Sequence, residues 1–271
     1  MIHHINPRLL TRAVKVILVG AGGTGSHVLR RLATIHMAMI ELGHPGGLEV
    51  LAIDPDTVSK TNIGRQAFYP SDLGQSKAAI LVNRCNLMMQ TKWKSEQSRL
   101  TDTSRFAINP DIVIGCVDNR KARAAILESI KHCFSDTVYW LDIGNREHDG
   151  QVILGEVVKS SNKENLGNRL PHAADLYPQI IDEKFDETDD TPSCSLAESL
   201  ERQSLFINDT LANQASNLLW ELFRFGQISH HGQFVNIKSG RVTPLTIDPV
   251  VWSRFGYSNA VKKRTRQKKV A

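Results

Sequence analysis

The stretch Val14-Lys-Val-Ile-Leu-Val-Gly-Ala-Gly-Gly-Thr-Gly-Ser26 places an apolar run directly before a cluster of glycines. The run suits a buried parallel strand. After Ser26 the pattern changes to helical spacing, with apolar residues at Val28, Leu29, Leu32, Ile35 and Met39. A strand, a glycine turn and a helix N-terminus form a phosphate cradle, because free N–H groups and the helix dipole point at the ligand.

A second apolar run, at residues 48–53, ends in Asp54-Pro-Asp56. Strand, helix and strand in this order form a βαβ unit with parallel strands and a right-handed crossover. An acid at the end of the second strand is placed to hold a ribose hydroxyl, so Asp54 is a candidate nucleotide ligand. The glycines that would form the cradle are Gly20, Gly22, Gly23 and Gly25. This turn alone is a weak signal. It predicts only that the protein binds a nucleotide, either a dinucleotide or ATP.

Further patterns extend the predicted sheet. Apolar runs predict strands at residues 111–117, 138–143 and 151–158, and helices that end near residues 89 and 133. We expect Asp72 to cap the first of these helices. Residues 234–237 and 241–247, on either side of Ser239-Gly240, predict an antiparallel hairpin. The expected fold class is therefore α/β, a doubly wound, Rossmann-like domain with a mixed sheet.

The polar segment at about 160–191 predicts a long crossover loop. Pro192-Ser-Cys194 then predicts the start of a helix that runs to Phe223. The predicted organisation is one domain over residues 1–250, followed by a basic tail over residues 251–271. That tail predicts either a solvated end or an electrostatic arm for nucleic acid or an acidic partner.

Composition bounds the class of protein. The chain has 271 residues, of which 41% are hydrophobic and 23% charged, as in soluble globular proteins. No apolar run approaches the ~20 residues of a membrane helix, and the N-terminus lacks a secretory pattern, so we expect a cytoplasmic protein. The cysteines Cys85, Cys116, Cys133 and Cys194 form no Cys-x-x-Cys pair. We therefore expect neither a zinc site nor a disulfide framework.

Three more motifs follow the glycine turn in order. They are Asp54-x-Asp56 with Asn62-x-x-Arg65-Gln66, Gly74-x-x-Lys77-Ala78, and Cys116-Val-Asp118-Asn119. Together with the turn they cover residues 14–125 and resemble the adenylation domain of the ubiquitin-activating (E1) superfamily, which includes the ThiF and MoeB sulfur-carrier activators. The arrangement is also similar to bacterial plasmid-associated ThiF-like proteins of the PRTRC type.

The resemblance implies ATP- and Mg²⁺-dependent adenylation of the C-terminal carboxylate of a small ubiquitin-like (β-grasp) protein. Arg65 and Lys77 would neutralise the phosphates, Arg65 as a bidentate fork. Asp118 would hold Mg²⁺. In isolation, Asp118 could instead be a helix N-cap and Lys77 a solvated helix residue. The ordered set of motifs favours the functional interpretation.

The remaining motif residues would complete the nucleotide site. Asp54 would bind ribose, and Asn62 would position a phosphate or the waters of the metal. The other nucleotide-binding residues implied by the resemblance are Asp56, Gln66 and Asn119. No general base is required, because the attacking carboxylate is already ionised at neutral pH.

Cys194 decides between branches of the superfamily. Thr191-Pro-Ser-Cys194-Ser resembles the Pro-x-Cys-Thr segment of E1 enzymes that carry the modifier as a thioester. A thiolate at a helix N-terminus is stabilised by the dipole, which makes Cys194 a candidate nucleophile. The acids at residues 186–190 act against this, because negative charge raises the pKa of a thiol. A capping-region cysteine without chemistry is the alternative.

Two departures from the family pattern affect the predicted partners. The zinc-binding cysteine pairs are missing, and so is the N-terminal arginine motif that reaches the ATP of the partner in dimeric members. Arg8 or Arg12 could replace that arginine in a homodimer, and an E2-like acceptor is possible. The alternatives are sulfur-carrier activation without a modifier thioester, an NAD(P)-dependent dehydrogenase, and a non-catalytic scaffold with a DNA-associating tail.

Overall fold

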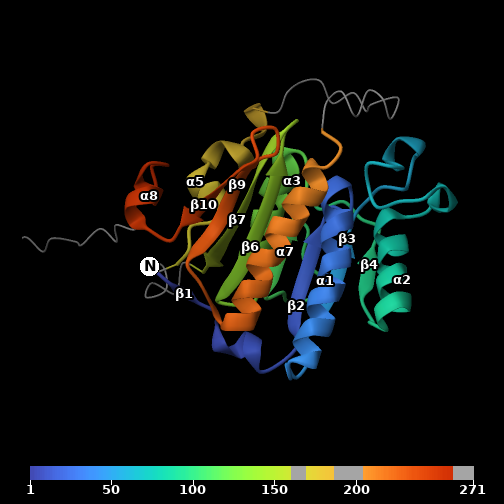
Figure 1. The fold of residues 1–271 in the computed structure, drawn as a ribbon, viewed down its shortest axis with the longest axis horizontal. Coiled ribbons are helices and arrows are strands. Elements are labelled where there is room, and N and C mark those ends of the chain that lie inside the picture. Colours follow the sequence, from blue (N-terminus) through green and yellow to red (C-terminus); the bar gives the residue numbers. More distant parts are fainter. Residues whose placement is uncertain (160–168, 186–203, 259–271) are drawn as a thin grey trace, which may run out of the picture.

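The computed structural model describes residues 1–159, 169–185 and 204–258. Among these residues, a mixed eight-stranded sheet has the order β10-β9-β7-β6-β5-β2-β3-β4 (Figure 1). Its strands are β2 (Val14–Val19), β3 (Leu48–Ile53), β4 (Lys94–Glu96), β5 (Ile112–Gly115), β6 (Thr137–Asn145), β7 (Asp149–Val158), β9 (His230–Asn236) and β10 (Arg241–Thr246). Strands β1 (His3–His4) and β8 (Gln227–Ile228) pair in a separate two-stranded sheet. The helices are α1 (Gly23–Glu41), α2 (Lys77–Met89), α3 (Arg120–Lys131), α5 (Ala173–Leu176), α7 (Ile207–Phe225) and α8 (Pro249–Ser253).

The predicted α/β class with a mixed sheet is confirmed. Strand β2 pairs in parallel with β3 on one side and with β5 on the other. The strand order therefore reverses at β2, and ligands of such sheets bind beyond the carboxyl ends of the strands at this switch point. On the far side of β6, strands β7, β9 and β10 are antiparallel, and the predicted hairpin is β9–β10.

The sheet separates two hydrophobic cores, because successive strand residues point to opposite faces. Val16 and Leu18 belong to the core that includes α1 and α7, whereas Ile17 and Val19 belong to the core that includes α3. Figure 1 shows α1 and α7 side by side on one face, with α3 on the other. The glycine turn after β2 thus lies between two packed layers.

Helix α2 is capped by a different residue from the one predicted. Helix α2 begins at Lys77, and the Ser76 hydroxyl caps it by accepting a hydrogen bond from the Ala79 N–H. Asp72 instead accepts a hydrogen bond from the Tyr69 N–H and pairs with Arg84. Gly74, which lies between the two, has a φ of +79°. This left-handed residue breaks the chain direction, so the helix starts only after it.

The predicted crossover loop at 160–191 contains a packed segment. Leu170, Ala173 and Leu176 are buried, and a Cβ on Gly155 of β7 would lie 2.2 Å from the Cα of His172. The helix predicted from Pro192 to Phe223 is interrupted at residues 204–206, after which α7 begins at Ile207. The predicted start at Pro192, and Cys194 with it, falls outside the described residues.

Helix α8 spans the boundary predicted at residue 250 and packs against the sheet. Trp252 in α8 is only 2% exposed, and its Nε1–H donates to Nε2 of His231 at 2.9 Å. Nδ1 of the same ring donates to the Leu154 carbonyl at 2.7 Å. These bonds fix the neutral ring and attach α8 to the sheet. Among the described residues, no helix combines the length and apolar character that a bilayer span needs.

The buried His231 predicts a loss of stability in acid. Burial lowers the pKa of its ring from 6.5 to about 4, so the unfolded chain binds its proton first and stability falls as the pH drops from about 6.5 toward 4. Between pH 7 and pH 5, urea unfolding should lose about 2 kcal/mol through this group. His3 and His172 have similarly lowered pKa values. The His231→Gln variant should therefore lose less stability between these pH values than the wild type, and an identical pH dependence would contradict the assignment.

Candidate nucleotide-binding site

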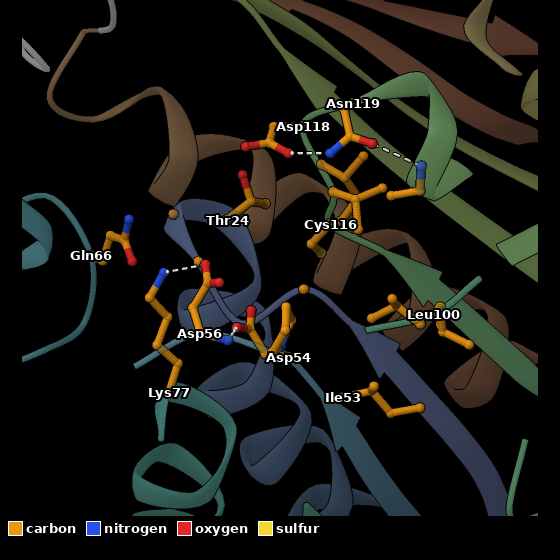
Figure 2. A pocket seen from close by; sticks show the side chains of 18 of the residues that line it. Thr24, Ile53, Asp54, Asp56, Gln66, Lys77, Leu100, Cys116, Asp118 and Asn119 are labelled. Carbon is orange, nitrogen blue, oxygen red and sulfur yellow. Dashed lines mark hydrogen bonds and ion pairs between the residues drawn. The ribbon is translucent and has the colours of Figure 1, made fainter. Parts of the chain in front are cut away.

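A cavity of about 390 Å³ lies beyond the carboxyl ends of β2, β3 and β5, at the switch point of the sheet. Figure 2 shows that its labelled side chains come from the ends of β3 and β5, from α1 and α2, and from the loops that carry Gln66 and Leu100. The predicted site residues that line it are Gly20, Gly22, Gly23, Asp54, Asp56, Arg65, Gln66, Lys77, Asp118 and Asn119. Residues that were scattered over a hundred positions of sequence therefore meet around one cavity.

The glycine turn packs closely on its protein side and is open on its cavity side. Gly20 has a φ of +89°, and a Cβ there would lie 2.6 Å from the Cys116 carbonyl oxygen. A Cβ on Gly25 would lie 1.8 Å from the Gly20 carbonyl oxygen. A Cβ on Gly22 would meet nothing within 4 Å. Gly25 thus lets α1 approach the turn from below, while the Gly22 backbone faces open space at the start of α1.

Asp54 fastens the glycine turn to the end of β3. Its Oδ2 accepts a hydrogen bond of 2.6 Å from the Ala21 N–H, and its Oδ1 accepts one of 2.8 Å from the Asp56 N–H. Burial raises the pKa of Asp54, and these two bonds oppose that rise. Each carboxylate oxygen can accept a second hydrogen bond, so the predicted contact with ribose is compatible with this anchoring.

Lys77 and Asp56 form an ion pair at the cavity wall. The Lys77 side chain is 9% exposed, and its Nζ lies 3.1 Å from Oδ2 of the more exposed Asp56 (Figure 2). The Lys77 N–H also donates to the Asp56 carbonyl. A nearly buried ammonium with one partner at the mouth of the cavity can exchange that partner for a phosphate.

Asp118 faces the cavity because its neighbour caps the next helix. Oδ1 of Asn119 accepts a hydrogen bond of 2.8 Å from the Ala122 N–H at the start of α3, and Nδ2 of Asn119 donates to Asp118. The alternative that Asp118 is the N-cap is therefore wrong. Burial lowers the pKa of Arg65, and the charge of Asp118 opposes this shift. The two side chains therefore interact electrostatically.

The loop that carries Gln66 contains one predicted residue that turns away. Asn62 lies in a short 3-10 helix, Lys60–Asn62, where its Oδ1 accepts hydrogen bonds from the N–H and hydroxyl of Ser59. Neither Asn62 nor Gly25 lines the cavity. Gln66 does line it, and its buried Oε1 has no hydrogen-bond partner in the part of the chain that the structure describes.

Several cavity residues were not predicted from the sequence. Thr24, Asn145 and Asn208 line the cavity together with residues 98–100. Asn145 ends β6 and Asn208 lies in the first turn of α7, far from the motifs in sequence. Single asparagines without a motif carry no signal that would have identified them.

Arg8 and Arg12 lie away from this cavity. They line a second cavity of about 540 Å³ that also includes Lys15 at the start of β2 and Thr137 at the start of β6. Arg12 makes two hydrogen bonds of 2.7 Å to the Asp111 carboxylate. This places both arginines at the amino ends of the parallel strands, so any contact with ATP would be with the ATP of another subunit.

The described cysteines are not activated. Burial raises the pKa of Cys85 and of Cys133 to about 11 and also raises that of Cys116. Their thiols are therefore protonated at neutral pH. Cys85 and Cys133 are core residues as expected, whereas Cys116 is half-buried and lines the cavity.

A switch-point cavity with a glycine turn, a buried lysine and facing acids is typical of nucleotide-binding α/β domains. The ThiF family model matches residues 8–246, and the chain belongs to the ThiF family. The narrower resemblance to PRTRC-type proteins stays a prediction.

Relatives within this family share part of the chain. The mouse (Mus musculus) ubiquitin-like modifier-activating enzyme 1 is 39% identical over 119 residues, which are 40% of this chain and 11% of that protein. The ubiquitin-like modifier-activating enzyme 5 of Dictyostelium discoideum is 27% identical over 165 residues, which are 54% of this chain and 40% of that protein. The matched regions thus cover less than half the length of either relative.

Solved structures share the fold. E. coli MccB, in a crystal structure with ATP, has a TM-score of 0.54 and 17% identity, covering 86% of this chain and 64% of that chain. The crystal structure of PaaA has a TM-score of 0.54 and 12% identity, covering 87% and 73%. At these identities the likeness concerns the fold.

Proposed function

We propose that this protein adenylates the C-terminal carboxylate of a small ubiquitin-like (β-grasp) protein with ATP. The observation that carries the proposal is the convergence of Arg65, Lys77 and Asp118 on one cavity beside an open glycine turn. Membership of the ThiF family and the names of the modifier-activating relatives support the substrate class.

The cavity fits ATP with Mg²⁺. The open side of Gly22 leaves room for phosphates at the N-terminus of α1, where N–H groups and the dipole favour anions. A polar group of the nucleotide could donate a hydrogen bond to the buried Oε1 of Gln66, which has no partner among the described residues. Mg²⁺ typically takes one or two carboxylates together with substrate phosphates, and Asp118 offers one at the cavity wall. When bound, the ion would neutralise phosphate charge.

The reaction joins two anions, so the chain must offset their repulsion. One oxygen of the substrate carboxylate bonds to the α-phosphorus, the bond from that phosphorus to the bridging oxygen breaks, and pyrophosphate leaves with the electron pair. No proton moves in this step, because the carboxylate is already ionised. Lys77 and Arg65 would stabilise the charge on the phosphates, and the rigid turn would hold the α-phosphorus in place.

A direct assay tests this proposal. The wild-type protein should catalyse exchange between ATP and labelled pyrophosphate with Mg²⁺ and a small β-grasp protein encoded beside its gene. The matched control is the same β-grasp protein with its C-terminal carboxylate amidated, which should support no exchange. Exchange that is equally fast with the amidated form would exclude activation of this carboxylate.

The second step of the proposal is transfer of the activated carbonyl to Cys194. The thiolate sulfur would bond to the carbonyl carbon, and AMP would leave with the oxygen that links it. The Cys194→Ala variant should retain pyrophosphate exchange but form no thiol-sensitive conjugate on a non-reducing gel, whereas Cys133→Ala should retain both. A conjugate that persists in Cys194→Ala would contradict this step. A wild type that exchanges without any conjugate would favour sulfur-carrier activation.

The proposed partners follow from the same chemistry. A thioester on Cys194 would require an acceptor, for which an E2-like protein is the proposed class. A homodimer would allow Arg8 or Arg12 of one subunit to reach the cavity of the other.

A further inference from the structure

Two neighbouring side chains in the first turn of α7 contact residues around the nucleotide cavity, although neither belongs to a family motif. Asn208 is 2% exposed and lines the cavity. Its Oδ1 accepts a hydrogen bond of 2.9 Å from the Thr24 hydroxyl and one of 3.3 Å from Nδ2 of Asn145. A Cβ on Gly23 would lie 2.8 Å from the Asn208 amide. The amide therefore packs directly on the first residue of α1 and limits the tilt of the glycine turn toward α7.

Asp209 extends the contact to the loop that carries Arg65. Its Oδ1 lies 3.0 Å from Nδ1 of His27 and 3.0 Å from a guanidinium nitrogen of Arg31. The backbone of Arg65 lies beside the His27 ring, where it opposes the lowering of the pKa of that ring by burial. Asp209 thus reaches, through His27 of α1, the loop that carries a cavity residue.

A second bond holds the same loop against α1. The Ser26 hydroxyl accepts a hydrogen bond of 3.1 Å from the Ala67 N–H. The Arg65 loop is therefore attached to α1 on both sides of Gln66, and α7 orients one of these attachments through the ring of His27.

We infer that Asn208 and Asp209 are positioning residues of the nucleotide site. Asn208 sets the glycine turn, and Asp209 sets the Arg65 backbone through His27. This inference rests on the proposed function for the identity of the ligand, ATP, but concerns its binding and not its turnover. The packing of α7 beside α1 thereby contributes to ATP recognition.

The test is a double-mutant cycle read by the dissociation constant of Mg²⁺-ATP, measured by calorimetry on the full chain. Asp209→Asn should weaken ATP binding about tenfold in the wild-type background, the size of one lost orienting contact of about 1.4 kcal/mol. In the Arg65→Ala background the same change should weaken ATP binding less than twofold, because the guanidinium that this backbone orients is absent. Asn208→Ala should weaken binding about tenfold in both backgrounds, because it acts on the glycine turn.

Matched controls separate positioning from folding. Arg31→Gln removes the other partner of Asp209 without touching the contacts to Arg65, and Asn217→Ala changes an exposed residue of α7. Both should bind ATP within twofold of wild type. Equal losses for Asp209→Asn in both backgrounds would overturn the inference, as would losses that only track the thermal unfolding midpoint.

The outcome is distinguishable from failure of the proposed function. A wild type that binds ATP but exchanges no pyrophosphate would remove the adenylation proposal and leave the cycle interpretable. A wild type that binds no ATP would overturn both.

Discussion

The Gly25→Ala variant is expected to lose ATP binding and about 3 kcal/mol of its free energy of unfolding. The added Cβ would lie 1.8 Å from the Gly20 carbonyl oxygen, and a backbone atom cannot rotate away as a side chain would. Helix α1 would have to move off the end of β2, which opens the packed core beneath it and deforms the turn. Urea unfolding and calorimetry with Mg²⁺-ATP measure the two effects.

The neighbouring Gly22→Ala variant is the matched control. Its Cβ would meet no atom within 4 Å, so the free energy of unfolding should stay within about 1 kcal/mol of wild type. ATP binding should still fall at least about tenfold, because the methyl group occupies space that the phosphates need. A Gly25→Ala variant as stable as wild type would contradict the predicted clash. A Gly22→Ala variant that binds ATP normally would show that the phosphates do not lie on this turn.

The Asp118→Ala variant should lose pyrophosphate exchange by about 100-fold or more, on the scale of removing a group that stabilises charge in a transition state. Its free energy of unfolding should be unchanged, because Asn119 and not Asp118 caps α3. The measurements are steady-state exchange at saturating ATP and urea unfolding.

The adjacent Asn119→Ala variant separates chemistry from capping. Loss of the cap should cost about 1 kcal/mol of stability. Full exchange by Asp118→Ala would remove Asp118 from the site. A fall in stability equal to that of Asn119→Ala would assign it a role in folding.

Much of the fold was predictable from apolar pattern alone. The bounds of β2 and β3 follow from the runs Val14–Val19 and Leu48–Ile53, because strands buried on both faces read as continuous apolar sequence. Strand β4, at Lys94–Glu96, is a polar edge strand without such a run. Its pairing with β3 is decided by tertiary contacts.

The site was predictable where a motif places a side chain at a strand end, as for Asp54 and Asp118. It was not predictable where local bonding competes. Asn62 uses its amide to cap the turn that contains it, as asparagine often does. Asn208 reaches the cavity only because α7 packs beside α1, a contact between segments about 180 residues apart.

The raised pKa values of three cysteines have a practical consequence. Because Cys85, Cys116 and Cys133 hold almost no thiolate at pH 7, an alkylating reagent added to the native protein will react with them slowly. Rapid uptake of a single isotopic tag per molecule, located by peptide mass mapping, would therefore measure the reactivity of the Cys194 thiol without any substitution in the sequence. The slow reaction of the other three thiols would keep the background labelling in such an experiment low.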